Sequence, residues 1–200
     1  MKLPHRSSLA DICNAFNFTS AVEIGTHHAI FADQFMLRFR GKIILVDPWL
    51  EQDKTFPTFY PTLKDVSESR EDDFRIAKAL MEKYEDRVEF LRMTSEEASC
   101  KFAPNSLDFV YIDGLHEFND VWNDLNLWYH KVRQGGIIAG HDYHGEALPG
   151  VVQAVNGFFS NKDFQIFLTQ EGMPSWWGIK QKHSIVPEVH HRFEKKSHDY

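Results

Sequence analysis

Two apolar, β-rich runs of the sequence stop abruptly at ionisable side chains. The first is followed by Asp113, with His116 three positions further on, and the second is followed by His141 and Asp142. If both runs are neighbouring strands of a parallel sheet, their carboxyl ends bring these side chains to one edge, which is where open α/β proteins bind ligands. Carboxylates at that edge can hold a cation, and a histidine there can take a proton near neutral pH.

A second polar group follows two earlier apolar runs. Glu23 and Gly25 flank the end of the first run, and Asp47 directly follows the run at 42–46. A glycine at a strand end lets the backbone turn sharply and approach a ligand closely. In doubly wound nucleotide-binding folds, an acid about 20 residues beyond that glycine accepts hydrogen bonds from ribose hydroxyls. Gly25 and Asp47 together predict a ligand of adenosine type.

The residues after Gly25 distinguish two classes of such ligands. A dinucleotide enzyme is expected to carry Gly-x-Gly-x-x-Gly, which places the pyrophosphate against a helix N-terminus. Here the run from Gly25 to Ile30 contains one glycine. S-Adenosylmethionine has no phosphate, and its amino and sulfonium groups are cationic, so acids such as Glu23 and Asp113 suit it better. The pattern favours S-adenosylmethionine over NAD and predicts a methyltransferase.

These residues need a sheet to position them, and the chain alternates apolar strand-like runs with segments of helical period. That alternation predicts a parallel sheet covered by helices on both faces. Strands are expected at 21–24, 42–46, 87–93, 107–112 and directly after Gly136, with a closing hairpin of 164–169 and 175–179. Helices are expected after the first strand and over 71–84, 94 onward, 118–132 and 148–159.

Two helices carry more detailed predictions. Thr94 and Glu97 have the spacing of a capping box, which marks a helix start. The helix at 118–132 is amphipathic, with Asp124 expected on its polar face and Gly135 and Gly136 expected to end it.

Length and composition predict one globular domain. The chain has 200 residues, of which 42% are hydrophobic and 26% charged, enough for one well-buried core and short for two. We expect the domain to span 1–187 and a charged, His-rich tail to follow at 188–200. The irregular segment 50–70 is expected to act as a lid or subunit contact, and its aromatic residues at 56–60 could pair two subunits as a homodimer.

Other features of the sequence disfavour several classes of partner. No apolar stretch approaches the roughly 20 residues that a membrane span requires. The formal net charge of -7 gives no basic surface for nucleic acid. Cys13 and Cys100 have no paired spacing, and no apolar leader follows the N-terminus, so a reduced, cytoplasmic protein is expected.

Four sequence blocks carry a resemblance to a known family. They are Val-Glu-Ile-Gly at 22–25, Val-Asp-Pro-Trp at 46–49, Tyr-Ile-Asp-Gly-x-His at 111–116 and Gly-Gly-Ile-x-Ala-Gly-His-Asp-Tyr at 135–143. In this order they resemble the class I S-adenosylmethionine-dependent methyltransferases, in particular the small bacterial type related to the catechol-type O-methyltransferases. The resemblance implies a Rossmann-like, doubly wound seven-stranded α/β sheet in the order 3-2-1-4-5-7-6, with the last strand antiparallel. It also implies methyl transfer to an oxygen of a small-molecule acceptor by direct displacement.

The resemblance implies roles for the strand-end residues. Glu23 and Gly25 are expected at the methionine end of the cofactor, Asp47 at the ribose, and Thr94, Ser95 and Glu96 at the adenine. The further residues expected to contact the cofactor are Thr26, Pro48, Trp49 and Asp113. The family often has a second glycine where Ala29 stands, ahead of Phe31, so the approach to the methionyl group is expected to be narrower.

On the acceptor side, the catechol-type relatives hold a divalent cation. Asp113, His141 and Asp142 match the positions of its ligands, but a histidine suits Zn²⁺, Mn²⁺ or Fe²⁺ better than Mg²⁺, so the presence of a metal stays open. The relatives also place a proton-accepting side chain where His116 stands, which makes His116 and Asp113 the candidate catalytic residues.

Structural interpretations of the same residues remain. Asp47 could cap a turn, Glu23 could pair with a nearby cation or backbone amides, and His116 could simply open the next helix. His141 could hold Asp142 without touching a metal, and His27 and His28 are expected to be loop residues near the cofactor rather than ligands. The alternative to an enzyme is a non-catalytic S-adenosylmethionine-binding or scaffold protein, and a nicotinamide-dependent oxidoreductase is a third hypothesis.

Overall fold

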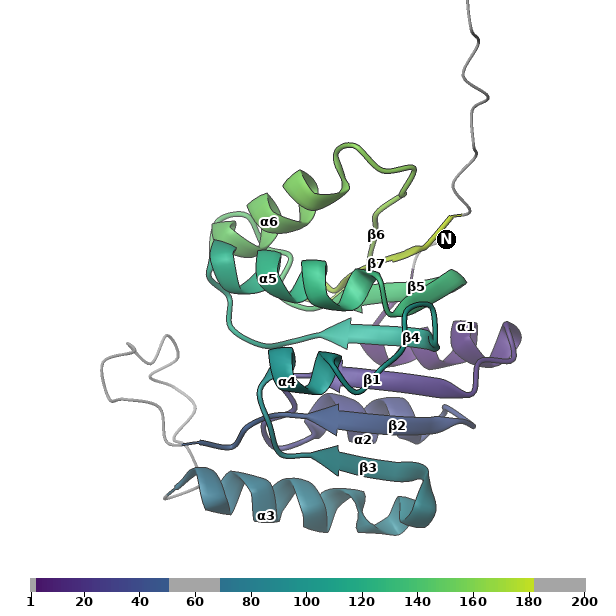
Figure 1. The fold of residues 1–200 in the computed structure, drawn as a ribbon, viewed down its shortest axis with the longest axis vertical. Coiled ribbons are helices and arrows are strands. Elements are labelled where there is room, and N and C mark those ends of the chain that lie inside the picture. The colour runs from purple at the N-terminus through teal and green to yellow at the C-terminus, as the bar shows by residue number, and fades with distance from the viewer. Residues whose placement is uncertain (1–2, 51–68, 182–200) are drawn as a thin grey trace, which may run out of the picture.

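The computed structural model describes residues 3–50 and 69–181 (Figure 1). Its strands are β1 (Ser20–Ile24), β2 (Lys42–Val46), β3 (Val88–Leu91), β4 (Leu107–Ile112), β5 (Val132–Gly140), β6 (Phe167–Leu168) and β7 (Trp176–Ile179). They form one sheet in the order β3-β2-β1-β4-β5-β7-β6, with β7 antiparallel to β5. The expected doubly wound α/β fold and its strand order are confirmed.

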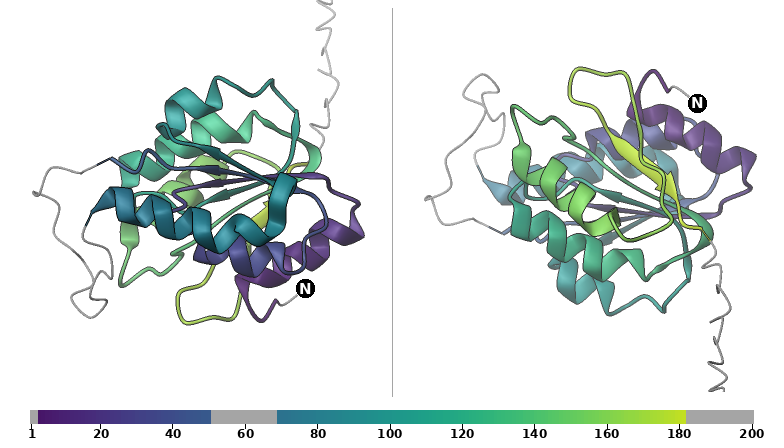
Figure 2. Two further views of the ribbon diagram at one scale, coloured as in Figure 1. Left: turned by 90° about the horizontal axis from the view of Figure 1, so that it is seen from below. Right: turned by 90° about the horizontal axis from the view of Figure 1, so that it is seen from above.

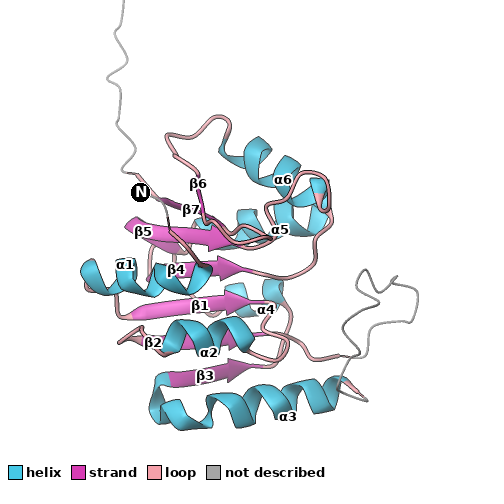
Figure 3. Ribbon diagram, turned by 180° about the vertical axis from the view of Figure 1, so that it is seen from behind, coloured by secondary structure: helices cyan, strands magenta, loops and turns pink. Residues whose placement is uncertain are grey.

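Helices cover both faces of this sheet. They are η1 (Arg6–Ser8), α1 (Leu9–Ala15), α2 (Ile30–Met36), α3 (Arg70–Met81), η2 (Glu82–Arg87), α4 (Ser95–Ser99), α5 (Phe118–Tyr129) and α6 (Pro149–Phe159). One apolar cluster joins α1, α2 and α3 to one face, and another joins α4, α5 and α6 to the other. Figures 2 and 3 show the sheet between these two layers. Alternate residues of the central strands point into opposite clusters, as the continuous apolar runs predict.

Most element predictions agree with the structure, because continuous apolar runs mark buried strands. β2 and β4 have the predicted bounds, the hairpin of β6 and β7 is present, and α4 begins with the predicted capping box of Thr94 and Glu97. Helix α3 ends at Met81 rather than at Tyr84, and the 3-10 turn η2 follows it. Nearly all of the predicted irregular segment at 50–70, including its subunit contact, lies outside the described residues, as does the tail at 188–200.

The predicted end of the helix at 118–132 is wrong. Helix α5 ends at Tyr129, and Gly135 and Gly136 lie inside β5. The pairing of β4 with β5 shifts register between Leu107 and Phe109, which makes β5 irregular near its start. A Cβ on Gly136 would lie 2.8 Å from the Asp108 carbonyl oxygen, and Gly135 has a φ of +76°. The glycine pair therefore serves a strand irregularity and not a helix stop.

The prediction that Asp124 lies on the polar face of α5 is also wrong. Its side chain is buried and accepts a hydrogen bond from the Ser95 hydroxyl, which in turn accepts one from Trp128 Nε1 at 2.8 Å. Burial raises the pKa of Asp124 to about 6, although the Ser95 hydrogen bond opposes the shift. A buried carboxylate with a single hydroxyl partner destabilises the fold when it is ionised.

Replacing Asp124 by asparagine is expected to stabilise the protein above pH 6. The folded state keeps the Asp124 proton up to about pH 6, whereas the unfolded chain releases it near 3.8, so stability falls as the pH rises through this window. Asparagine keeps the acceptor for Ser95 and removes the charge. The free energy of unfolding should exceed that of the wild type by about 3 kcal/mol at pH 8 and by about half as much at pH 5.

Urea unfolding at both pH values measures this difference. Asp163→Asn is the control, because Asp163 is an exposed carboxylate outside α5. A gain that is equal at pH 5 and pH 8 would show that the charge of Asp124 is not the cause.

Candidate cofactor and acceptor site

The carboxyl ends of β1, β4 and β5 lie side by side and place the predicted site residues together. The parallel register pairs Ile24 with Ile112 and Ile112 with Gly140, so the next residues along each strand, Gly25, Asp113 and His141, are neighbours. Backbone hydrogen bonds extend this alignment past the strands, from Asp113 N to the Ile24 carbonyl at 2.8 Å and from His141 N to the Ile112 carbonyl at 3.0 Å.

Gly25 leaves no room for a side chain at this edge. Its φ is +83°, and a Cβ there would lie within 2.5 Å of the Asp113 carbonyl carbon and the Gly114 Cα. Only glycine fits this conformation and this space. The turn after β1 therefore packs directly on the loop after β4.

Glu23 and Thr26 present buried oxygens without partners at the same edge. Glu23 is 1% exposed and Thr26 is 4% exposed. Glu23 Oε2 and Thr26 Oγ1 have no hydrogen-bond partner within the described structure. Burial, reinforced by the charge of Asp113, raises the pKa of Glu23 well above its usual range, although Thr26 and Arg6 oppose the shift. Such orphaned acceptors are rare in folded proteins and suit a ligand that brings its own donors.

The carboxylate of Asp47 is occupied by backbone amides. Oδ2 accepts from His27 N at 2.9 Å, and Oδ1 accepts from Trp49 N at 2.8 Å. This is the turn-capping arrangement that the sequence left as an alternative. Each carboxylate oxygen keeps a further lone pair, so binding to a ribose stays a prediction for Asp47. Pro48 is half-buried beside it and Trp49 is buried.

The residues predicted for the adenine lie at the start of α4. The Thr94 hydroxyl and the Glu97 side chain cap the helix, and the Ser95 hydroxyl is held by Asp124 and Trp128. Glu96 is exposed. Because the Ser95 hydroxyl is already hydrogen-bonded within the protein, backbone groups would have to make the contacts with an adenine there. The role of these residues stays a prediction.

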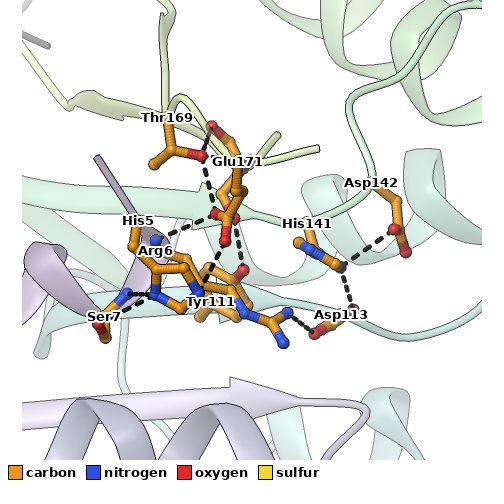
Figure 4. Close-up of polar contacts among 10 residues, drawn as sticks. His5, Arg6, Ser7, Tyr111, Asp113, His141, Asp142, Thr169 and Glu171 are labelled. Atoms are coloured by element: carbon orange, nitrogen blue, oxygen red, sulfur yellow. Dashed lines mark hydrogen bonds and ion pairs between the residues drawn. The ribbon is translucent and has the colours of Figure 1, made fainter. Parts of the chain in front are cut away.

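On the acceptor side, the four predicted residues form a chain of ion pairs. His141 Nδ1 lies 3.0 Å from Asp142 Oδ1 and 3.5 Å from Asp113 Oδ1, so the imidazole bridges two carboxylates, as Figure 4 shows. His116 Nε2 lies 2.8 Å from Asp142 Oδ2. These residues line a cavity of about 10 Å³, which is about the room that one water molecule needs.

The carboxylates set the protonation of both histidines. Burial alone would lower the pKa of His141, but hydrogen bonds and charge from Asp113 and Asp142 raise it to about 9. The hydrogen bond to Asp142 raises the pKa of His116 in spite of partial burial. Burial would raise the pKa of Asp142, but the two histidines lower it strongly. The cluster is a network of opposite charges and not a set of free ligands.

The segment that carries the strand-end residues matches a known protein family. A family model described as a methyltransferase domain matches residues 22–143, more than half of the chain. The chain belongs to this methyltransferase family. The matched segment runs from the start of the Glu23 block to the end of the Asp142 block. With the sheet order described above, the protein is a class I S-adenosylmethionine-dependent methyltransferase.

Other relatives of the methyltransferase support the fold. Solved structures of a protein from Corynebacterium glutamicum, a methyltransferase from Geobacter sulfurreducens and a Staphylococcus aureus protein assigned by name to the caffeoyl-CoA O-methyltransferases have TM-scores of 0.65, 0.60 and 0.62. Their identities to this chain are 15%, 14% and 12%, and the matches cover 91%, 87% and 86% of it and 84%, 76% and 80% of those chains. At this level of identity they show the fold alone.

A viral protein matches part of the sequence more closely. The uncharacterized protein R132 of Acanthamoeba polyphaga mimivirus is 44% identical over 54 residues, which are 26% of this chain and 24% of that protein. The methyltransferase thus spans about a quarter of this relative's length.

Arg6 is a residue of the methyltransferase site that the sequence did not reveal. Its Nη1 lies 3.3 Å from Asp113 Oδ2 (Figure 4). Its guanidinium lies over the Phe31 ring, 5.5 Å from the centroid. The backbone N–H of Arg6 donates to Glu171 Oε1 at 3.0 Å, which anchors the segment before α1. No local pattern marks Arg6, because only the folded chain brings it to Asp113.

The methyltransferase site fits a divalent metal poorly. Asp113, His141 and Asp142 each offer one ligand atom, all within 4.8 Å of one another. However, the His141 imidazole bridges both carboxylates, and a pKa of about 9 keeps its proton in place. A metal needs deprotonated ligands and would have to displace this proton. Protonated His141, together with Arg6 beside Asp113, already provides the positive charge that a metal would bring.

No helix within the described residues is both long and apolar enough to cross a membrane.

Proposed function

We propose that this methyltransferase transfers a methyl group to an oxygen of a small-molecule acceptor. The observation that carries the proposal is the pair of His116 and Asp142 beside Asp113, at the strand edge where the cofactor is expected. A hydroxyl acceptor must lose its proton when it is methylated, so it needs a base, whereas a neutral amine can attack without one. A His–carboxylate pair at this place supplies such a base.

The geometry of His116 suits the role of proton acceptor. Its Nε2 faces Asp142, so with the proton of the neutral ring on Nε2, Nδ1 carries the lone pair. Its side chain is 39% exposed, so this nitrogen can reach an acceptor. Asp142 orients the ring and stabilises the imidazolium that forms once the proton has moved.

At the cofactor end, the chain's own residues would bind and orient. When bound, S-adenosylmethionine supplies a methyl group that is already activated on a sulfonium. Glu23 Oε2 and Thr26 Oγ1 are proposed to accept hydrogen bonds from its amino group, and Gly25 lets the backbone approach the methionyl moiety. Binding that holds the reacting groups in line can contribute about 7–11 kcal/mol to lowering the barrier.

Replacing Glu23 by glutamine is expected to weaken cofactor binding and to stabilise the fold. A hydrogen bond to a charged group contributes about 1.5–3 kcal/mol, so the Kd for S-adenosylhomocysteine should rise roughly 10- to 150-fold. Burial raises the pKa of Glu23 above its value in the unfolded chain, so at neutral pH folding must either bury the charge or take up a proton, and glutamine removes that cost. Calorimetry and urea unfolding measure the two effects.

Because the variant should bind the cofactor less tightly and yet be more stable, a loss of binding cannot be the result of unfolding. Glu89→Gln is the control, because Glu89 is exposed on β3. If Glu23→Gln binds the cofactor as the wild type does, the side chain does not contact it.

The reaction itself is tested with methyl-labelled S-adenosylmethionine and matched panels of phenols, alcohols and amines. Label in hydroxyl acceptors is the expected result. Label in amines alone would contradict the oxygen assignment. Cofactor binding without transfer to either panel would favour the non-catalytic binding protein.

A further inference from the structure

A second cluster of metal-ligating side chains lies outside the acceptor site. His27 and His28 follow Gly25 in the loop between β1 and α2, and both face Asp73 in the first turn of α3. His28 Nε2 lies 2.7 Å from Asp73 Oδ1, and His27 Nε2 lies 3.6 Å from Asp73 Oδ2. The three ligand atoms lie within 4.8 Å of one another. The sequence predicts the loop position of both histidines, but not their meeting with Asp73.

An unusual backbone holds the two histidines on one side of the loop. Their rings stack with centroids 3.8 Å apart and planes inclined by 24°. His27 has a φ of +48° and Ala29 a φ of +61°, a left-handed conformation that non-glycine residues rarely adopt. The His27 N–H donates to Asp47, and its carbonyl accepts from Trp49 Nε1 at 2.9 Å, which fixes the turn. Backbone strain of this kind is concentrated at functional sites.

We propose that His27, His28 and Asp73 bind one divalent transition-metal ion, with Zn²⁺ as the best match. Two imidazoles and one carboxylate are ligands that zinc accepts, whereas Mg²⁺ prefers oxygen. In a tetrahedral zinc site, neighbouring donor atoms lie about 3.4 Å apart. His28 Nε2 lies 2.7 Å from Asp73 Oδ1 and needs a small outward shift, and His27 Nε2, which faces Asp73 Oδ2 at 3.6 Å, needs a small shift toward Oδ1 from within the 4.8 Å that the three ligand atoms span.

The burial of the three side chains fits a metal that keeps one open position. Asp73 is 2% exposed and His28 is 17% exposed, so both are held by packing, whereas His27 is 47% exposed and leaves a path from solvent.

Arg70 is compatible with this site as a partner of the ligand. Its Nη1 lies 2.9 Å from Asp73 Oδ2, and its side chain is 39% exposed. A carboxylate that ligates a metal through one oxygen is commonly hydrogen-bonded through the other. Asp73 Oδ1, next to His28, is thus the oxygen for the metal, and Arg70 holds Oδ2.

Metal titration of the full chain tests the site. Protein stripped with a chelator is titrated with Zn²⁺ by calorimetry and with Co²⁺ by visible ligand-field absorbance, for the wild type, His27→Gln and His28→Gln. We expect His27→Gln and His28→Gln each to bind Zn²⁺ at least about tenfold more weakly at one site. The Co²⁺ absorbance of that site should be lost in both variants. Zn²⁺ should raise the unfolding temperature of the wild type more than that of either variant.

Two control variants locate the metal. His130→Gln removes an exposed histidine at the end of α5 and should bind as the wild type does. His141→Gln removes the histidine of the acceptor cluster and should also keep the site. Histidines outside the described residues are common to all variants. Equal binding by His27→Gln, His28→Gln and the wild type, or loss in His141→Gln instead, would overturn the proposal.

Discussion

Gly25→Ala should lose both stability and cofactor binding. An alanine there adds a Cβ within 2.5 Å of the Asp113 carbonyl carbon and the Gly114 Cα, in a backbone with a φ of +83°. Neither obstacle is the end of a flexible side chain, so the turn after β1 and the loop after β4 must move apart. Overpacking costs about 1–3 kcal/mol, and the left-handed conformation adds about 1–2 kcal/mol for alanine.

Together these terms approach the whole stability of a marginal domain, which is about 5–15 kcal/mol. Urea unfolding measures the loss, and calorimetry with S-adenosylhomocysteine measures binding. Gly172→Ala is the matched control, because a Cβ on Gly172 meets nothing within 4 Å. Its free energy of unfolding should stay within about 0.5 kcal/mol of the wild-type value. A stable Gly25→Ala protein that binds the cofactor normally would show that this contact does not shape the site.

The fold was predictable because its signals are local or periodic. The continuous apolar runs of β2 and β4 identify buried strands, and the capping box at Thr94 identifies the start of α4. The position of a strand end then follows, which is why Asp113 and His141 could be expected at one edge. The helix stop at Gly135 was a wrong prediction because a glycine pair serves a strand irregularity as well as a helix end.

The parts of the site that the sequence missed depend on contacts between distant segments. Arg6 lies near the N-terminus, yet it pairs with Asp113. Asp73 lies on α3, yet it meets both histidines of the turn after β1. Asp124 has a polar neighbourhood in the sequence, but α5 turns it toward Ser95. In each case the partner is set by packing of elements, which no spacing along the chain encodes.

These missed contacts change the expected electrostatics of the acceptor side. The sequence shows Asp113 and Asp142 as two acids that could hold a divalent cation. In the fold, Arg6 and protonated His141 lie beside those acids, so the cationic groups come from the chain itself, and His116 is hydrogen-bonded to Asp142. This arrangement makes proton transfer by His116 the catalytic contribution that a mutation can isolate.

His116→Ala should lower kcat by about 10²- to 10⁴-fold with a hydroxyl acceptor, the usual contribution of a general base. The half-buried His116 lies in the loop before α5, so the fold and the affinity for S-adenosylhomocysteine should be kept, while the free energy of unfolding falls because buried Asp142 loses one of its two histidine partners. Asp142→Asn should also lower kcat, because the ring loses the carboxylate that orients it. In the double variant, the loss should be close to that of His116→Ala alone, since both residues act through one proton transfer.

Initial rates at saturating cofactor, with the unfolding curve of each variant, measure these effects. His130→Ala serves as the control, because it removes an exposed histidine at the other end of α5. Two independent, additive losses would mean that Asp142 does more than orient His116. Unchanged turnover by His116→Ala would show that His116 is not the base. The proposal of an oxygen acceptor would then lose the residue on which it depends.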